Sequence, residues 1–465
     1  MLETGAKPRV VVIGGGISGL AAAHRLSTSG LFVTLVEKNR QLGGKVVTEH
    51  VDGFLIERGP DSFVAGKGTV IELATGLGIA PRIISSRPEY RGSYVWSRGR
   101  LHPLPEGLLL MAPSRLGPLF RSSLLSWRGK VRAAADLLVP RRQAEGDESL
   151  ESFVVRRLGR EVLDLIAEPL IAGIHAAEPA TMSLRASFPR FLEMERKHRS
   201  LILAARAAES KPAASGSSHF ASFKDGMGEL TQALVKDLQG VDVRTGVHVT
   251  RLRPTGASHL LDLSDGTHLD AAGVILAAPS RDSAKLLGEG SPTAAASIAE
   301  IHQVTTTAIT LGYRKDQIPP LLGSGFVVPT TEARRIMGVS YLSQKWEGRV
   351  PTEEFALIRA FVRRDAEPDR LTESVMGDLA DLVGITGSPK LRRVHRWEDG
   401  LHQYTLGHLE RVARAEQALF EGPPLALAGA AFHGIGLNEC IASGQRAADH
   451  IAAMVKPHVG TAVSY

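Results

Sequence analysis

A glycine-rich turn between a short strand and a helix constrains this chain more than any other feature. The apolar run 9–13 predicts a buried strand, and residues 20–26 are typical of a helix. Between them lie Gly14, Gly15, Gly16, Ile17, Ser18 and Gly19. The first glycine suits a tight turn, the third lets a pyrophosphate approach the backbone, and the last lets helix and strand pack closely. This order of elements predicts a dinucleotide site.

An acidic residue follows at the position that a ribose needs. A second predicted strand, 31–36, leads into Glu37, roughly 20 residues beyond the turn, where a carboxylate accepts hydrogen bonds from ribose hydroxyls. The start of the helix offers free N–H groups and the positive end of its dipole to phosphates. The chain therefore has a predicted Rossmann-type domain for FAD or NAD, and the acid disfavours NADP.

Composition excludes several other classes of protein. The 465 residues suffice for two or three domains, and 43% hydrophobic with 22% charged residues is ordinary for a globular protein. The net charge of +6 fits an acidic ligand, a membrane surface or nucleic acid, but aromatic residues are only 5%, so we expect no nucleic-acid partner. The single cysteine, Cys440, excludes a disulfide framework, and the histidines lack ligand spacing. We expect no metal and a reducing, cytoplasmic location.

Hydrophobic patterning divides the rest of the chain. Helical periodicity dominates from about 90 to 205, especially over 150–170 and 188–208, and the breaker-rich stretch 209–218 predicts a loop. Strand-like runs return at 241–249, 260–263, 274–276, 304–311 and 355–362. Near the end, 425–428 predicts a strand, followed by a glycine-rich turn and a helix from Leu437. This second turn suggests that both ends of the chain build one nucleotide domain around an inserted substrate domain.

The leucine- and proline-rich segment 101–125 has two interpretations. No window of 18 residues is apolar and uncharged, so we expect no membrane-spanning helix. The segment contains Arg115 and Arg121, and Arg128 follows it. It suits a peripheral contact with a bilayer surface, and it equally suits a cover over a substrate cavity.

Further motifs give the chain a family resemblance. Residues 59–63 read Gly-Pro-Asp-Ser-Phe, and residues 403–411 begin Gln-Tyr-Thr-Leu-Gly-His. The segments that carry the resemblance are 37–45, 59–63, 195–202, 397–411 and 434–441. From about residue 8 to 452 the chain resembles the flavin amine-oxidase superfamily and, within it, the oxygen-dependent protoporphyrinogen/coproporphyrinogen oxidase family. Gln41 and Lys45 stand where the superfamily usually has arginines.

The resemblance implies an FAD enzyme of α/β and α+β class. It implies a Rossmann-type FAD-binding domain in three parts, 1–85, 211–290 and 391–465, with a helical, membrane-binding-like region at 86–210 and a substrate-binding sheet at 291–390. The residues expected to hold FAD are Gly14, Gly15, Gly16, Ile17, Ser18, Gly19, Glu37, Lys38, Gly44, Lys45, Gly59, Pro60, Asp61, Ser62, Val249, Trp397, Ile435, Gly436 and Leu437. Those expected to line a tetrapyrrole cavity are Asp61, Lys67, Gly173, Phe326, Val327 and Phe361.

The implied reaction removes six electrons from a porphyrinogen in three rounds, with O2 as acceptor, hydrogen peroxide as product and no dedicated acid–base pair. The Gram-positive type, which oxidises coproporphyrinogen III, shares the motifs at 59–63 and 101–103 and has a lysine where Lys67 stands. The type specific for protoporphyrinogen IX has an arginine where this chain has Ser93. We therefore favour coproporphyrinogen III, with protoporphyrinogen IX as the second candidate. The alternative function is another oxidase or desaturase of the superfamily, acting on an amine or a carotenoid precursor.

Smaller expectations concern two groups of residues, a partner and the location. His198 and Arg199 either meet substrate propionates or belong to a solvated helix face. Cys440 is either a reactive thiol at a helix start or a small packing residue. A ferrochelatase is a candidate partner, and the location is expected to be cytoplasmic, with or without a peripheral contact to the cytoplasmic membrane.

Overall fold

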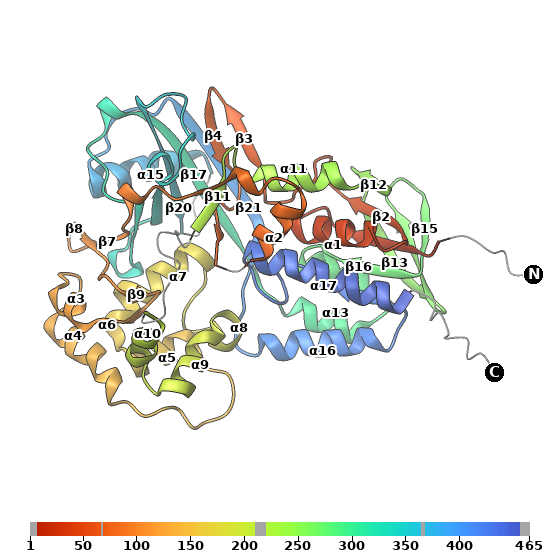
Figure 1. The fold of residues 1–465 in the computed structure, drawn as a ribbon, viewed down its shortest axis with the longest axis horizontal. Helices are drawn as coiled ribbons and strands as arrows, with labels where there is room; N and C mark the ends of the chain where they lie inside the picture. The colour runs from red at the N-terminus through yellow and green to blue at the C-terminus, as the bar shows by residue number, and fades with distance from the viewer. Residues whose placement is uncertain (1–6, 67, 210–219, 364–367, 456–465) are drawn as a thin grey trace, which may run out of the picture.

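The computed structural model of this chain describes residues 7–66, 68–209, 220–363 and 368–455. Figure 1 shows an elongated molecule with two halves. One half carries both termini and is built like a nucleotide-binding domain. In the other half, a large sheet lies beside a helical region. Lys67 falls outside the described residues.

A five-stranded parallel sheet forms the first half, and its strands come from distant parts of the chain. In spatial order they are β12 (Val241–Thr245), β2 (Phe32–Glu37), β1 (Arg9–Ile13), β16 (Gly273–Leu276) and β22 (Leu425–Leu427). The central strands are buried on both faces, which explains their unbroken runs of branched apolar residues. Because β1 and β22 belong to one sheet, both ends of the chain build this half.

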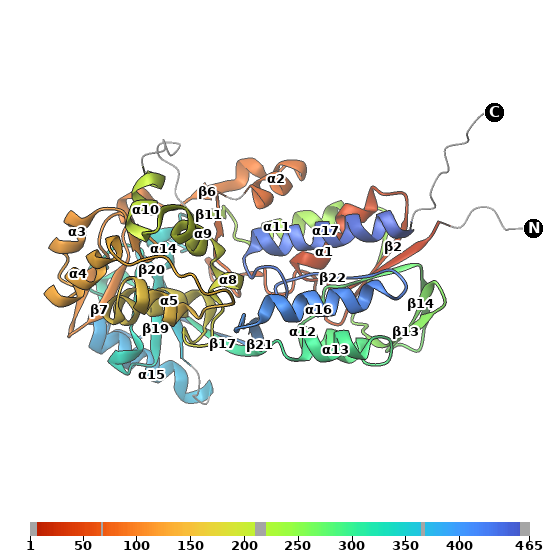
Figure 2. The same ribbon diagram turned by 90° about the horizontal axis from the view of Figure 1, so that it is seen from below.

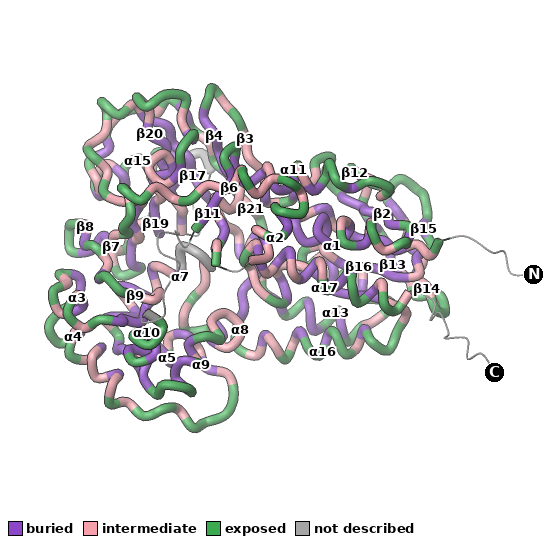
Figure 3. The backbone as a smooth tube through the Cα atoms, in the orientation of Figure 1, coloured by how far each residue is buried: buried purple, intermediate pink, exposed green. Residues whose placement is uncertain are grey.

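Helices cover both faces of this sheet, as Figure 2 shows. One face carries α1 (Ile17–Ser27), α11 (Gly228–Asp237) and α17 (Leu437–Val455), with α2 (Thr69–Gly76) beside them. The other carries α12 (Ser280–Leu287), α13 (Pro292–Ala299), α16 (His408–Phe420) and a small sheet of β13 (Val249–Thr255), β14 (Ser258–Leu263) and β15 (His268–Ala271). Figure 3 shows that much of α1 is buried. The strand predicted over 241–249 is two strands, because Gly246 turns the chain with φ of 73°.

The second half contains a seven-stranded sheet. Its order is β21 (Leu391–His402), β17 (Gln303–Arg314), β20 (Phe355–Val362), β19 (Ile336–Tyr341), β18 (Gly325–Val327), β7 (Tyr94–Ser97) and β8 (Arg100–Pro103). One face packs on α15 (Pro368–Val383) through an apolar core that includes Tyr313, Phe326 and Tyr341. The opposite face looks towards the helical region and the first half, so it is the face that can border a site between the halves.

The helical region is assembled from short helices. They are α3 (Leu116–Arg121), α4 (Trp127–Ala134), α5 (Leu150–Arg157), α6 (Arg160–Val162), a π-helix (Leu163–Ala167), α7 (Glu168–His175), α8 (Leu184–Ser187), α9 (Pro189–His198) and α10 (Leu201–Glu209). The helical pattern at 188–208 is broken at Arg199, whose φ is 65°. A buried ion pair, in which Arg157 Nε donates to Asp136 Oδ1 at 2.6 Å, fixes the centre of the region.

Further short elements complete the fold. They are the hairpin β3 (Thr48–Val51) and β4 (Phe54–Glu57), the small sheet of β5 (Phe63–Val64), β11 (Phe220–Phe223) and β6 (Ile83–Ser85), the strand pair β9 (Leu108–Leu109) and β10 (Ala112–Pro113) in the helical region, and the helix α14 (Leu342–Lys345) against the large sheet. Within the described ranges, no helix has the length and apolar character needed to cross a bilayer.

Candidate functional site

The first glycine turn, between β1 and α1, is shaped by close backbone approaches. Gly14 has φ of 111°, and its N–H donates to Val36 O at 2.8 Å. A Cβ on Gly19 would lie 1.8 Å from Gly14 O, so only glycine lets α1 start this near β1. A Cβ on Gly16 would meet nothing within 4 Å. The open side of Gly16, at the start of a helix with no side-chain cap, is where a pyrophosphate can approach.

Glu37 lies at the end of β2 with its carboxylate against this turn. It accepts hydrogen bonds from Gly15 N at 2.6 Å and from Asn39 N at 2.8 Å, and only 7% of the residue is exposed. A second segment also contacts Glu37, since Val247 N donates to Glu37 O at 3.2 Å. This bond brings Val249, the first residue of β13, near the same residue. Glu37 and Val249, both expected to hold FAD, are therefore close together.

A second loop with paired glycines packs on the first turn. Gly43 N donates to Gly15 O at 2.8 Å, and a Cβ on Gly44 would lie 3.0 Å from Gly16 Cα. Lys45 is half-buried behind them, and burial lowers the pKa of its ammonium. Lys38 points elsewhere and forms an exposed ion pair with Asp282 at 3.0 Å. The structure brings Gly44 and Lys45 to the turn but not the charge of Lys38.

The loop at 58–62 connects the two halves, and its backbone is held by the large sheet. Trp397 Nε1, on β21, donates to Arg58 O at 2.8 Å. Arg359 Nη1, on β20, donates to Gly59 O at 2.7 Å. A Cβ on Gly59 would lie 2.0 Å from Lys45 O, so this loop also presses on the glycine loop described above. The predicted cofactor residues Gly59, Pro60 and Trp397 thus stand at one junction.

Asp61 in the same loop is held by two cations. Lys345 Nζ, from α14, donates to Asp61 Oδ2 at 3.1 Å, and Ser62 Oγ donates to Asp61 Oδ1 at 2.8 Å. Burial alone would raise the pKa of Asp61, but the Lys345 ammonium and the Arg359 guanidinium outweigh burial and hold that pKa well below its usual range. The Asp61 carboxylate is therefore charged across the physiological pH range, with the Lys345 ammonium and the Arg359 guanidinium beside it.

The second glycine turn, between β22 and α17, lies near this junction, because Asn438 at the start of α17 donates from Nδ2 to Val64 O at 3.0 Å, just beyond the loop at 58–62. Gly434 has φ of 124°, and Ile435, Gly436 and Leu437 lead directly into α17. The N-terminus of such a helix carries partial positive charge, which favours an anionic group. Cys440 is buried there, and burial raises the pKa of its thiol to about 11. This thiol fits the packing interpretation, not the reactive one.

The sheet residues that were expected to line the cavity lie on opposite faces of the large sheet. Val327 and Phe361 both pair with Gly338, so their side chains stand on one face on either side of a residue without a side chain. Phe326 points to the opposite face and is buried against Tyr341. Adjacent residues of a strand cannot line the same cavity. Gly173 lies in α7, which packs against β18 and β19.

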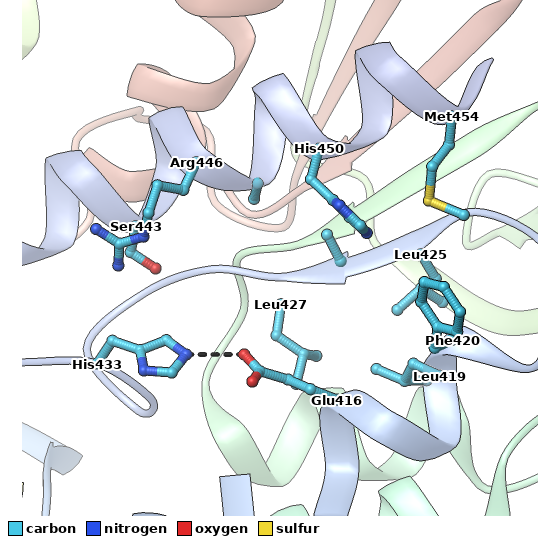
Figure 4. Close-up of a pocket in the computed structure, with 12 residues that line it drawn as sticks. Glu416, Leu419, Phe420, Leu425, Leu427, His433, Ser443, Arg446, His450 and Met454 are labelled. Atoms are coloured by element: carbon cyan, nitrogen blue, oxygen red, sulfur yellow. Dashed lines mark hydrogen bonds and ion pairs between the residues drawn. The ribbon is translucent and has the colours of Figure 1, made fainter. Parts of the chain in front are cut away.

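Other predicted or possible contacts lie away from this junction. His198 and Arg199 are exposed at the end of α9, where Arg199 Nη2 donates to Leu137 O at 3.0 Å, so the solvated-face interpretation holds. Among the described residues, no group of three His, Cys, Asp or Glu side chains is placed to bind a metal. A cavity of about 300 Å³ lies between α16, β22 and α17 (Figure 4), and none of the predicted cofactor or substrate residues lines it.

Sequence reasoning missed two functional candidates, Arg359 and Lys345. A sequence signal existed for the first, because Arg359 is the single charge inside the apolar run 355–362 and is buried in the structure. A buried arginine requires partners, and only the fold shows that they are Gly59 O and Asp61. Lys345 carried no comparable signal.

The residues at this junction fit a flavin dinucleotide. The unfilled side of Gly16 suits a pyrophosphate, the Glu37 carboxylate suits ribose hydroxyls, and the start of α17 suits the edge of a flavin ring that gains negative charge on reduction. The residues that would hold FAD are those of the two glycine turns, the loop at 43–45 and the loop at 58–62.

Comparisons with known proteins agree with this geometry. Residues 17–452 match the family described as flavin containing amine oxidoreductase. The coproporphyrinogen III oxidase of Bacillus subtilis (strain 168) is 33% identical over 95% of this chain and 97% of that protein. The coproporphyrinogen III oxidase of Propionibacterium freudenreichii is 35% identical, over 95% of this chain and 90% of that protein. A solved structure from Exiguobacterium sp. 255-15, provisionally assigned as a protoporphyrinogen oxidase, is 31% identical with a TM-score of 0.86, over 96% of this chain and 99% of that one.

Proposed function

Because the chain belongs to the flavin-containing amine oxidoreductase family, we propose that it is an FAD-dependent oxidase of coproporphyrinogen III. The family match confirms the predicted family, the Rossmann-type fold class and the flavin cofactor. In the proposed reaction, coproporphyrinogen III loses six electrons and six protons to become coproporphyrin III, and three O2 become three hydrogen peroxide. Protoporphyrinogen IX is the second proposed substrate.

The observation that carries the proposal is the loop at 58–62. It contacts the glycine loop at Lys45 on one side, and on the other it is held by β20 and β21 of the large sheet. A flavin held at the glycine turns would therefore face the sheet surface that carries Val327 and Phe361. The Lys345 ammonium and the Arg359 guanidinium beside this loop supply positive charge, which supports a substrate that bears carboxylates.

The role of the protein in this reaction is to orient the substrate against the cofactor and to enclose both away from water. FAD supplies a two-electron acceptor that O2 can reoxidise. Arg359 and Trp397 fix the loop carbonyls, and the glycine turns fix the cofactor end. The apolar side chains of Val327 and Phe361 exclude water from the reacting carbon, and α7 closes the same face.

We also propose a cytoplasmic location with a peripheral contact to the membrane. The supporting patch lies on α4 and the residues after it, where Trp127 is 68% and Leu138 is 82% exposed, beside the exposed Arg128. The Phe120 ring lies 5.4 Å from Trp127 and extends the patch into the segment 101–125. Sedimentation with anionic vesicles, and its loss in Trp127→Ala, tests this contact. A ferrochelatase is the proposed recipient of the porphyrin product.

The experiment for the proposed function uses purified, flavin-loaded protein with each porphyrinogen under air. We expect porphyrin fluorescence to rise well above the spontaneous rate, with about three peroxides per porphyrin and a higher kcat/KM for coproporphyrinogen III. A higher kcat/KM for protoporphyrinogen IX would reverse the substrate assignment. Oxidation of an amine with neither porphyrinogen oxidised would favour the amine-oxidase alternative.

A further inference from the structure

The second glycine turn is held by side chains from outside it. Tyr404 Oη donates to Ala430 O at 2.8 Å and accepts from Gly434 N at 2.7 Å. His408 Nε2 donates to Phe432 O at 3.0 Å. Three alternate residues of the turn are thereby fixed by two side chains.

The two clamping side chains form one rigid unit. The rings of Tyr404 and His408 are stacked with centroids 3.8 Å apart and planes at 14°. Both residues are buried, and burial lowers the pKa of His408 to about 4 and raises the pKa of Tyr404. The neutral histidine donates from Nε2, and within the described ranges its Nδ1 has no hydrogen-bond partner. The clamp is therefore uncharged and keeps the same hydrogen bonds across the physiological pH range.

Two further contacts hold the same turn. Gly429 N donates to Ser443 Oγ at 3.1 Å. His433 pairs with Glu416 at 2.7 Å, as Figure 4 shows. These contacts tie the turn to α17 and α16, in addition to the bonds from Tyr404 and His408.

The segment at 403–408, which carries Tyr404 and His408, also contacts the helical region. Ser183 N donates to Tyr404 O at 2.8 Å, and Leu406 N donates to Thr181 O at 2.9 Å. Gly407 N donates to Asp147 Oδ2 at 3.1 Å. The segment at 403–408 thus lies between the region expected to cover the substrate and the turn expected to face the flavin.

We propose that Tyr404 and His408 are positioning residues that set the geometry of Ile435, Gly436 and the start of α17 against the flavin ring. The inference rests on the proposed function only in requiring FAD at this turn. When reduction places negative charge on the ring, the N–H groups and the helix dipole stabilise that charge only from a fixed position. A loosened turn would therefore make the flavin harder to reduce.

The test is Tyr404→Phe, which keeps the ring stack and removes both hydroxyl bonds. Tyr313→Phe is the matched control, since Tyr313 is a buried tyrosine of the α15 core whose hydroxyl has no partner among the described residues. We expect Tyr404→Phe to lower the flavin midpoint potential, change the visible flavin spectrum and reduce kcat about 10-fold, with KM within twofold. Tyr313→Phe should match the wild type in all of these.

Two outcomes decide the proposal. A Tyr404→Phe protein with the potential, spectrum and kcat of the control, and only a lower Tm, would show a structural role and overturn the proposal. If Tyr404→Phe does not fold, His408→Gln provides the second variant, and an unchanged flavin potential there would overturn the proposal equally. The potential is measured on flavin-loaded protein without porphyrinogen, so a wrong substrate assignment would leave this test intact.

Discussion

The two glycine turns have the same order of strand, turn and helix, but different contacts hold them. The first is fixed by close backbone approach, as between Gly19 and Gly14 O, and by the Glu37 carboxylate of the next strand, which accepts from Gly15 N. The second is fixed by the side chains of Tyr404 and His408, which lie just before and at the start of another helix. The comparison teaches that the glycine pattern and the acid that follows it specify the first turn, whereas the second depends on side chains that its own glycine pattern does not predict.

The strongest test of this difference is Gly19→Ala. The new Cβ would lie 1.8 Å from Gly14 O, and neither backbone can move without separating α1 from β1. We expect the free energy of unfolding to fall by about 3 kcal/mol, together with loss of flavin. Urea unfolding and flavin content measure this.

Gly377→Ala is the matched control for the first test. Gly377 lies inside α15 with nothing within 4 Å of its added Cβ. Alanine there should raise stability by roughly 0.5–1 kcal/mol because glycine is the poorer helix former. Equal effects at Gly19 and Gly377 would contradict a sterically specified first turn.

Removal of the acid at the first turn should have the next largest effect. Glu37→Ala leaves the buried N–H of Gly15 and the N–H of Asn39 without their acceptor and removes the proposed ribose contact. We expect about 2–3 kcal/mol of lost stability and at least about 10-fold weaker FAD binding. Glu37→Gln should keep most of the stability, since its amide oxygen can still accept from Gly15. Unchanged FAD affinity in Glu37→Ala would reject the ribose role.

Acid should lower folding stability through the second turn, because that turn is held by His408. Its pKa falls from 6.5 to about 4 on folding, so the unfolded chain binds a proton there that the folded chain does not. Above about pH 6.5 the histidine is neutral in both states, and the free energy of unfolding has its full value. As the pH falls from 6.5 towards 4, the unfolded chain takes up the proton and the free energy of unfolding decreases, by about 2 kcal/mol at pH 5.

The variant His408→Gln tests whether His408 causes this pH dependence of stability. Unfolding by urea at pH 7 and pH 5 should show a smaller pH difference in His408→Gln than in the wild type, whatever the absolute stability of the variant. Parallel pH profiles would mean that the clamp histidine does not titrate as proposed.

The smallest expected change in stability is for Gly16→Ala. Nothing lies within 4 Å of the added Cβ, and the backbone of Gly16 is extended, with φ of −73°. We expect stability within about 0.5 kcal/mol of the wild type but a marked loss of FAD, because the methyl group fills the pyrophosphate approach. Retained flavin would place the pyrophosphate elsewhere.

The predictable part of the site follows from backbone requirements. Gly14, Gly19 and Glu37 stand where the sequence predicts them, because glycine conformation and strand length set their positions. The junction at 58–62 was predicted only through the family resemblance. Its partners Arg359 and Lys345 could not be derived, since they come from β20 and α14 and meet the loop only after the halves pack.

Strand alternation marks another limit of prediction. Phe326 and Val327 are neighbours, so only one of them can face the site, and the sequence does not tell which face of the sheet α15 will cover. Likewise, the motif at 403–411 indicated a family, but the hydrogen bonds of Tyr404 became visible only in the fold.

The most direct test of the proposed function is anaerobic mixing of the flavin-loaded protein with coproporphyrinogen III, followed through the visible flavin band. The proposed function predicts rapid bleaching by coproporphyrinogen III, slower bleaching by protoporphyrinogen IX, and full recovery of the band when O2 is admitted. Flavin that stays oxidised with both porphyrinogens would contradict it.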